Sequence, residues 1–244
     1  MAGVLAEDGP VTAVSRVMDI VLLGGLWLPR DVWAQVVTEL AADGLRGVPV
    51  LLPGQGDGNR TATLDDQLTA AMVAVDEFEG RPLVVGHSAS SALAWMVADA
   101  RPDKVAGVVL IGGFPVPDGA TYADFFPVVD GVMPFPGWET FEGPDSADLD
   151  QATRERLAAA MIPVPDGVSR GTVQLTDERR YDVPVTLICP EFSPQQAKEW
   201  IASGEVTELS LVKQLDLVDI DSGHWPMVTQ PGTLAQLLEA ARTR

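Results

Sequence analysis

The chain has little cysteine, little histidine and little positive charge. Its 244 residues include one cysteine, Cys189, so no disulfide can form within it and nothing indicates an oxidising compartment. With two histidines, His87 and His224, beside that cysteine, a zinc site of nitrogen and sulfur ligands is not expected. Lysine and arginine number 16 against 35 acidic residues, a formal net charge of −19. Nucleic acid and anionic membrane surfaces repel such a chain, so neither is an expected partner.

Long apolar runs are also missing. No run reaches the roughly 18–20 apolar residues that a membrane-spanning helix needs. The first residues carry acidic side chains and show neither the basic region nor the apolar core of a secretion signal. We therefore expect a soluble cytoplasmic protein, with residues 1–18 as a loose, Gly- and Ala-containing N-terminal arm. The sequence leaves open whether the chain forms a homodimer.

The residues that are plentiful predict an α/β fold. Apolar residues make up 46% of the chain and charged residues 21%, which allows a large core. Short apolar runs, typical of strands buried on both faces, alternate with helical patterns, and this alternation predicts a mostly parallel sheet flanked by helices. Strands are expected at 19–23, 48–52, 83–85, 105–111, 183–188 and 215–220, and helices at 31–42, 64–78, 90–100, 153–161, 194–202 and 231–241.

The alternation stops after the fourth predicted strand. About seventy residues rich in proline, glycine and aromatic side chains follow, with a helix near 153–161 and no strand pattern. A connection of that length is unusual inside an α/β domain, so we expect an inserted helical cap at 114–182. Residues 19–113 and 183–244 would then form one core.

One stretch carries the pattern of a catalytic turn. The apolar run at 83–85 enters a turn of small residues from Gly86 to Ser90 and leaves as an Ala-rich helix. Ser88 stands at the apex, where such a turn exposes the hydroxyl beside the free N–H groups of the helix start. Gly86 and Ser90 are small, as a tight turn requires.

This strand–turn–helix with Ser88, the cap, and the Gly-His pair ending in His224 after the last strand together resemble the α/β-hydrolase superfamily. The resemblance covers nearly all of the chain from Asp19 on and is greatest to small capped members, here with the first hairpin reduced. It implies Ser88 as nucleophile and His224 as general base. His87 is expected to point away from Ser88. The N–H groups of Leu26 and Ala89 would form the oxyanion hole.

The acid that would orient His224 is less clear from the sequence. The superfamily usually places an aspartate after the strand that follows the cap, but loop 189–194 contains Glu191 as its only carboxylate. A glutamate is chemically adequate to hold the imidazole tautomer. Two alternatives stay open: Asp118, and a Ser–His dyad supported by water or a carbonyl.

The resemblance implies a serine hydrolase that cleaves a small apolar ester or lactone through an acyl-Ser88 intermediate and needs no cofactor. Alternatives are a carbon–carbon bond hydrolase, cyclase or dehydratase on the same fold, and a non-catalytic ligand-binding member. Aromatic side chains, although also typical of a core, would line the pocket for a small apolar substrate. These candidates are Trp27, Phe114, Phe125, Phe126, Trp138 and Trp225.

Overall fold

The computed structural model describes residues 19–242, so the predicted arm at 1–18 lies outside the described residues. Within them a six-stranded sheet has the order β2-β1-β3-β4-β7-β8, and every neighbouring pair is parallel. The predicted parallel sheet is confirmed. Its strands are β1 (Asp19–Leu23), β2 (Arg46–Pro49), β3 (Leu83–His87), β4 (Gly107–Ile111), β7 (Val185–Cys189) and β8 (Leu215–Asp219).

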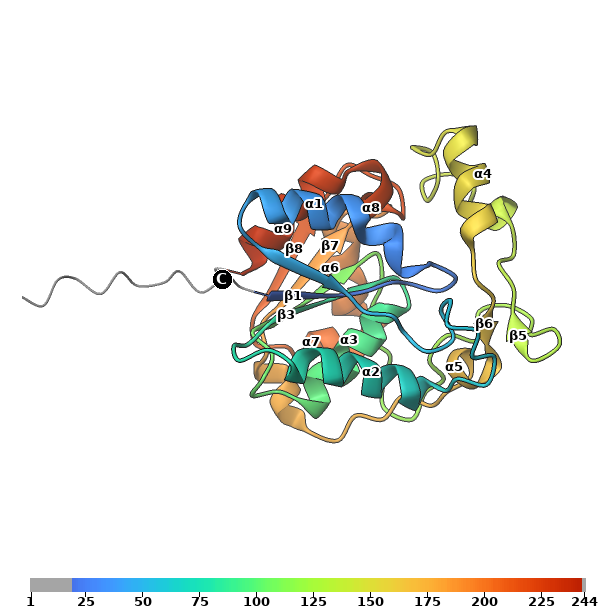
Figure 1. Ribbon diagram of the computed structural model, residues 1–244. Helices are drawn as coiled ribbons and strands as arrows, with labels where there is room; N and C mark the ends of the chain where they lie inside the picture. Colours follow the sequence, from blue (N-terminus) through green and yellow to red (C-terminus); the bar gives the residue numbers. More distant parts are fainter. Residues whose placement is uncertain (1–18, 243–244) are drawn as a thin grey trace, which may run out of the picture.

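Helices cover both faces of this sheet, which is why its central strands are continuous apolar runs. On one face lie α1 (Ala34–Ala42), which follows the 3-10 turn η1 (Arg30–Trp33), and α8 (Pro226–Thr229) and α9 (Pro231–Ala241) (Figure 1). The other face packs against α2 (Leu64–Asp76), α3 (Ser90–Ala100), α6 (Pro194–Ser203) and α7 (Thr207–Ser210). No helix within 19–242 has the length and apolar character needed to cross a bilayer.

Local sequence signals explain where several elements begin. Thr63 caps α2: its hydroxyl accepts from the Asp66 N–H at 3.2 Å, and the Asp66 carboxylate accepts from the Thr63 N–H at 2.9 Å. The predicted strand 48–52 is displaced, since β2 is Arg46–Pro49. As an edge strand, β2 pairs only with β1. The apolar residues after Pro49 lie in the following loop, where Leu52 is buried without belonging to the sheet.

Between β4 and β7 lies what we call the inserted segment, residues 112–184. Its residues 132–169 extend beyond the carboxyl ends of the parallel strands, and its last residues return along the core to the amino end of β7 (Figure 1). No strand was expected here, but the structure has a small antiparallel pair, β5 (Val132–Met133) and β6 (Val164–Pro165), each too short to leave a period-2 pattern in the sequence. The remaining elements are η2 (Trp138–Phe141), α4 (Gln151–Ala160), α5 (Asp166–Ser169) and η3 (Glu178–Asp182).

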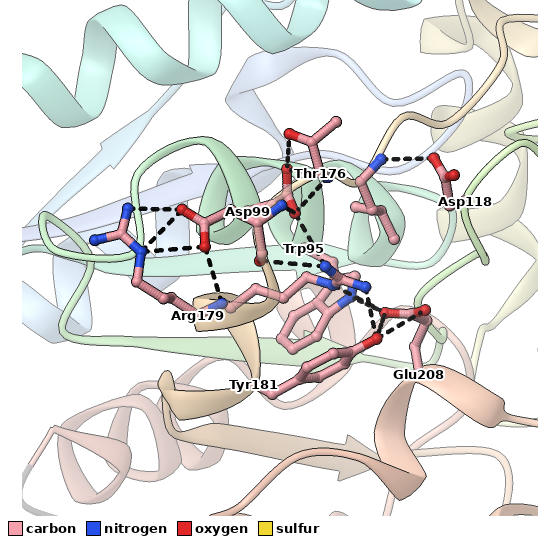
Figure 2. Close-up of polar contacts among 10 residues, drawn as sticks. Trp95, Asp99, Asp118, Thr176, Arg179, Tyr181 and Glu208 are labelled. Carbon is pink, nitrogen blue, oxygen red and sulfur yellow. Dashed lines mark hydrogen bonds and ion pairs between the residues drawn. The ribbon is translucent and has the colours of Figure 1, made fainter.

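The inserted segment rejoins the core at a buried charged cluster. Arg180 on η3 forms ion pairs with Asp99 on α3 (3.2 Å) and Glu208 on α7 (3.1 Å). Glu208 also accepts hydrogen bonds from the Trp95 indole N–H (2.9 Å) and from the Tyr181 hydroxyl (Figure 2). We call these five residues the Arg180 cluster. It ties the end of the inserted segment to the helix that begins at Ser90.

Candidate active site

Ser88 stands on a strained turn between β3 and α3. Its φ of +54° lies in the left-handed region, which is costly for a residue other than glycine. The Ser88 N–H donates to the Ile111 carbonyl oxygen at 2.8 Å and so holds the turn against β4. A Cβ at Gly86 would overlap the Ser90 carbonyl, and a Cβ at Gly113 would overlap that of Ser88. The packing around the turn therefore requires glycine at both positions.

His224 lies on the loop between β8 and α8, beside the glutamate that follows β7. Its Nδ1 is 2.8 Å from Glu191 Oε1, and both side chains are about 85% buried, with exposures of 14% and 15%. An ionised carboxylate only accepts hydrogen bonds, so Nδ1 donates and Nε2 keeps its lone pair. Gly112 (φ +57°) allows this approach, since a Cβ there would lie 3.2 Å from both Glu191 Oε2 and His224 Nδ1.

The other arrangements left open by the sequence are not seen in this structure. Asp118 accepts a hydrogen bond from the Leu175 N–H at 2.8 Å, in the neighbourhood of the Arg180 cluster (Figure 2). The carboxylate beside His224 Nδ1 is Glu191.

Ser88 and His224 line one small apolar pocket of about 160 Å³. The Ser88 hydroxyl forms no hydrogen bond with any part of the chain that the structure describes, so it is available to a bound molecule. Contacts between nucleophile and base are often long without substrate and tighten when it binds. The pocket is lined by Leu26, Trp27, His87, Ser88, Phe125, Phe126, Phe141, His224 and Trp225.

Two of the aromatic residues expected in this pocket lie elsewhere. Phe114 stacks on Phe192, with ring centroids 5.4 Å apart, because the chain turns toward α6 directly after β4. Trp138 packs against Trp225 at 5.2 Å, and its indole N–H donates to the Arg154 carbonyl, which holds it outside the pocket. Trp27, Phe125, Phe126 and Trp225 are in the lining, and Phe141 joins them without a sequence signal that marks it.

Two backbone N–H groups are available near Ser88. Ala89 is the N-cap residue of α3, where the first N–H groups have no helical partner. Leu26 lies in the loop after β1 and lines the pocket. Across residues 19–242, neither N–H forms a hydrogen bond with the protein. Gly25 brings this loop close to Ser88, since a Cβ there would lie 2.7 Å from His87 Nδ1 and 3.1 Å from Ser88 Cβ.

The loop that contains Leu26 is fixed on several sides. The Ser90 hydroxyl donates to the Gly24 carbonyl at 2.6 Å, and the Gln55 side-chain amide donates to the Gly25 carbonyl at 3.2 Å. Trp27, with φ +63°, is held by the inserted segment: its indole N–H donates to Met133 at 3.1 Å, and its carbonyl accepts from the Ile162 N–H at 2.8 Å. The backbone donors are thus held in place before any ligand binds.

His87 has a place in the site that the sequence did not indicate. It was expected only to point away from Ser88, yet its ring lines the same pocket and is 99% buried. Its Nε2 is 2.7 Å from the His224 carbonyl oxygen, so Nε2 carries the hydrogen. Burial, and then the neighbouring His224, lower the pKa of His87 to about 3. His87 is therefore neutral near pH 7 and supports the His224 backbone.

The described part of the chain has no group of three or more His, Cys, Asp or Glu side chains arranged to hold a metal ion. Cys189, at the end of β7, is buried, and desolvation, followed by the nearby Asp219 and Glu191 charges, raises the pKa of its thiol to about 12. The thiol therefore stays protonated and unreactive near neutral pH.

The chain is similar to several known proteins. Part of the chain is 28% identical to Lipase LipV of Mycobacterium tuberculosis over 134 residues, which is 54% of this chain and only 47% of the lipase. An extracellular alpha/beta-hydrolase from a Paenibacillus species, described as a structural and functional homologue of tobacco salicylic acid binding protein 2, superposes with a TM-score of 0.74 at 17% identity, covering 93% of this chain and 100% of its own.

Two further solved structures share the fold. The methylesterase MES16 from Arabidopsis superposes with a TM-score of 0.74 at 16% identity over 92% of this chain and 98% of its own. A pyrethroid hydrolase from Sphingobium faniae superposes with a TM-score of 0.63 at 21% identity over 93% and 98%. Residues 20–237 match the sequence model of the alpha/beta hydrolase family. The chain therefore belongs to the alpha/beta hydrolase family.

Proposed function

We propose that this protein is a serine hydrolase that cleaves a small apolar carboxylic ester or lactone through an acyl-Ser88 intermediate. The observation that supports it most is the 2.8 Å contact of Glu191 with His224 Nδ1, which leaves Nε2 unprotonated in the pocket that Ser88 lines. A base with a free lone pair beside an exposed hydroxyl is the requirement for an activated serine.

The proposed reaction has two halves. His224 Nε2 takes the proton of the Ser88 hydroxyl as Oγ attacks the substrate carbonyl, and the N–H groups of Leu26 and Ala89 donate to the oxygen that becomes negative. The imidazolium then protonates the leaving alkoxide, and an acyl-Ser88 ester remains. Water, deprotonated by His224, then attacks this ester; the bond to Ser88 Oγ breaks, the imidazolium returns its proton to Oγ, and the acid is released. Glu191 keeps Nδ1 protonated and stabilises the imidazolium in both halves.

The pocket supports an uncharged substrate. Apart from Ser88 and the two histidines, its lining consists of apolar and aromatic side chains, and it holds about 160 Å³. It contains no lysine or arginine to pair with an anion, and the net charge of −19 disfavours anionic molecules at long range. The inserted segment contributes Phe125, Phe126 and Phe141 and would act as the cap of the pocket.

Labelling tests the nucleophile. The wild-type protein is incubated with a fluorophosphonate probe, and intact mass and peptide mapping locate the adduct. We expect one adduct, on Ser88, and hydrolysis of p-nitrophenyl acetate or butyrate that Ser88→Ala abolishes. Ser210→Ala, which changes an exposed serine on α7, is the control and should label and turn over as the wild type does. Hydrolysis that survives Ser88→Ala, or absence of labelling, would overturn the proposal.

A further inference from the structure

A turn of the inserted segment is bonded to the loop that carries His224. The turn, residues 145–148, precedes α4. The His224 N–H donates to the Asp145 carbonyl at 2.7 Å, and the Gly223 N–H donates to Asp148 Oδ2 at 2.8 Å. The Ser222 hydroxyl lies 3.2 Å from the same Asp148 oxygen and 2.9 Å from both the Gly223 carbonyl and the Thr229 hydroxyl, so these acceptors share its one hydrogen. Three consecutive residues that end at the proposed base are thus held by two residues of the inserted segment.

The peptide groups on either side of His224 are held from opposite directions. Its N–H is bonded to Asp145 in the inserted segment, and its carbonyl accepts from His87 Nε2, on β3, at 2.7 Å. With both bonds made, the Cα of His224 is fixed, and the ring direction is then set by the Nδ1 contact with Glu191. Burial, and then the Glu191 charge, raise the pKa of Asp145, in keeping with its place next to this pair.

The turn itself is well anchored, so it can hold the loop. Ser146 is fully buried and its hydroxyl donates to the Phe141 carbonyl at 2.6 Å. The Arg154 guanidinium on α4 donates to the Ser146 carbonyl at 2.6 Å and to the Leu149 carbonyl at 3.2 Å. Leu149 packs in the same apolar cluster as Trp225 of the core. The Asp148 carboxylate is therefore presented from a rigid support.

We propose that Asp148 is a positioning residue for His224: its carboxylate fixes the backbone of residues 222–223, so that the imidazole bridges Glu191 and Ser88 only while the inserted segment is seated. The inference rests on the proposed function of the site. It adds that the inserted segment sets the geometry of the base as well as the walls of the pocket. A displacement of about 1 Å at a reacting group can lower a rate about a hundredfold, so even a small shift of the His224 ring would be measurable as a lower rate.

A substitution at Gly223 offers an independent way to separate turn 145–148 from the loop that carries His224. A Cβ at this position would overlap the Asp145 carbonyl and the Asp148 carboxylate. Its φ is outside the left-handed region, so alanine suits the backbone there and the strain falls on the contact with the inserted segment. Gly223→Ala should therefore move the turn away and disturb the position of His224, while the side chains of Ser88, Glu191 and His224 are themselves unsubstituted.

The experiment compares Asp148→Ala, Asp148→Asn and Gly223→Ala on the p-nitrophenyl ester that the wild type hydrolyses. We expect Asp148→Ala to lower kcat about tenfold with KM nearly unchanged, because a charge-assisted hydrogen bond is lost. Asp148→Asn keeps an acceptor oxygen and should recover part of kcat, whereas Gly223→Ala should lose more. The matched control is Asp150→Ala. Asp150 also lies in the inserted segment and also accepts a backbone N–H, at 2.8 Å from Thr153, but contacts nothing on the His224 loop.

A second readout does not depend on turnover. In Asp148→Ala, the ring proton resonances of His224 should shift and the Gly223 amide should exchange faster with solvent, and neither change should occur in Asp150→Ala. If the wild type fails to react with fluorophosphonate, the proposed function fails, and these resonances still test the positioning role. Unchanged kcat and His224 resonances in Asp148→Ala would overturn the inference, as would equal losses in Asp150→Ala.

Discussion

Within residues 19–242, charged side chains are largely buried both in the Arg180 cluster and at the proposed site, and the two regions are built differently. In the Arg180 cluster, Arg180 is paired with both Asp99 and Glu208, and Asp99 also accepts the backbone N–H groups of Thr176 and Asp177. At the proposed site, buried polar atoms lack a partner among the described residues: Glu191 Oε2 and His87 Nδ1. One region is saturated with hydrogen bonds and the other is not.

The difference distinguishes a region that stabilises the fold from a region whose polar groups stay available for a reaction. A satisfied polar network favours one arrangement of the chain and holds the inserted segment against α3. Unpaired buried atoms cost free energy, and proteins tolerate them mainly where function requires a group to remain available. Substitutions in the Arg180 cluster should therefore change stability more than turnover, and substitutions at the site should do the reverse. The predictions below test that contrast.

The largest effect is expected at Glu191. Glu191→Gln removes the charge that stabilises the His224 imidazolium and allows the wrong tautomer, so kcat should fall about 10³- to 10⁴-fold. The free energy of unfolding should change by less than about 1 kcal/mol, because the glutamine amide has nearly the same shape and can still form a hydrogen bond with His224 Nδ1. Steady-state kinetics and urea unfolding measure the two quantities.

Glu199→Gln, on the exposed side of α6, is the matched control for Glu191→Gln and should leave both quantities unchanged. A kcat for Glu191→Gln within tenfold of the wild type would contradict the assignment and would favour a Ser–His dyad that needs no carboxylate.

The next effect is on stability. Arg180→Ala leaves Asp99 and Glu208 buried without their cation and should lower the free energy of unfolding by about 3–5 kcal/mol. The kcat of the protein that remains folded should stay within about threefold. Arg179→Ala is the neighbouring control: its side chain is 58% exposed and its ion pairs are with Asp103 and Asp177, so it should lower the free energy of unfolding far less than Arg180→Ala does. Equal losses in the two variants would remove the contrast between the regions.

The effect that is smallest near neutral pH is the pH dependence of the free energy of unfolding at His87, which grows only on acidification. Burial holds the folded-state pKa of His87 at about 3, below the ordinary histidine value of 6.5. As the pH falls below 6.5, the unfolded chain binds a proton there that the folded chain does not. The stability that the fold gains from keeping His87 neutral is therefore fully present above pH 6.5 and is lost toward pH 3. The free energy of unfolding falls by at most about 1.4 kcal/mol per pH unit in this range.

Urea unfolding of the wild type and His87→Gln between pH 7 and pH 4 measures this slope. The variant retains no group that titrates at position 87, so its unfolding free energy should fall less steeply with acidification. Parallel curves for the two proteins would show that His87 is not held neutral by the fold.

Much of the architecture could be predicted because its signals are local. Helix α9 (Pro231–Ala241) lies where its apolar spacing and Pro231 placed it, and the α2 start follows from Thr63 and its capping partner. The sharp turn at Ser88 follows from small residues between a strand and a helix. The exceptions are β2, an edge strand that its apolar run mislocated, and the short β5–β6 pair.

The sequence by itself determined the order of strands and helices along the chain and the sharp turn at Ser88, because each depends on residues adjacent along the chain, and the alternation of these elements predicted the parallel sheet. The tertiary structure decided which carboxylate lies beside His224, that His87 supports its backbone, that Phe114 faces α6, and that Asp148 reaches its loop. These contacts join residues from 33 to 137 positions apart, as Glu191–His224 and His87–His224 show. Their geometry depends on the paths of whole loops, and composition or spacing alone cannot specify those paths.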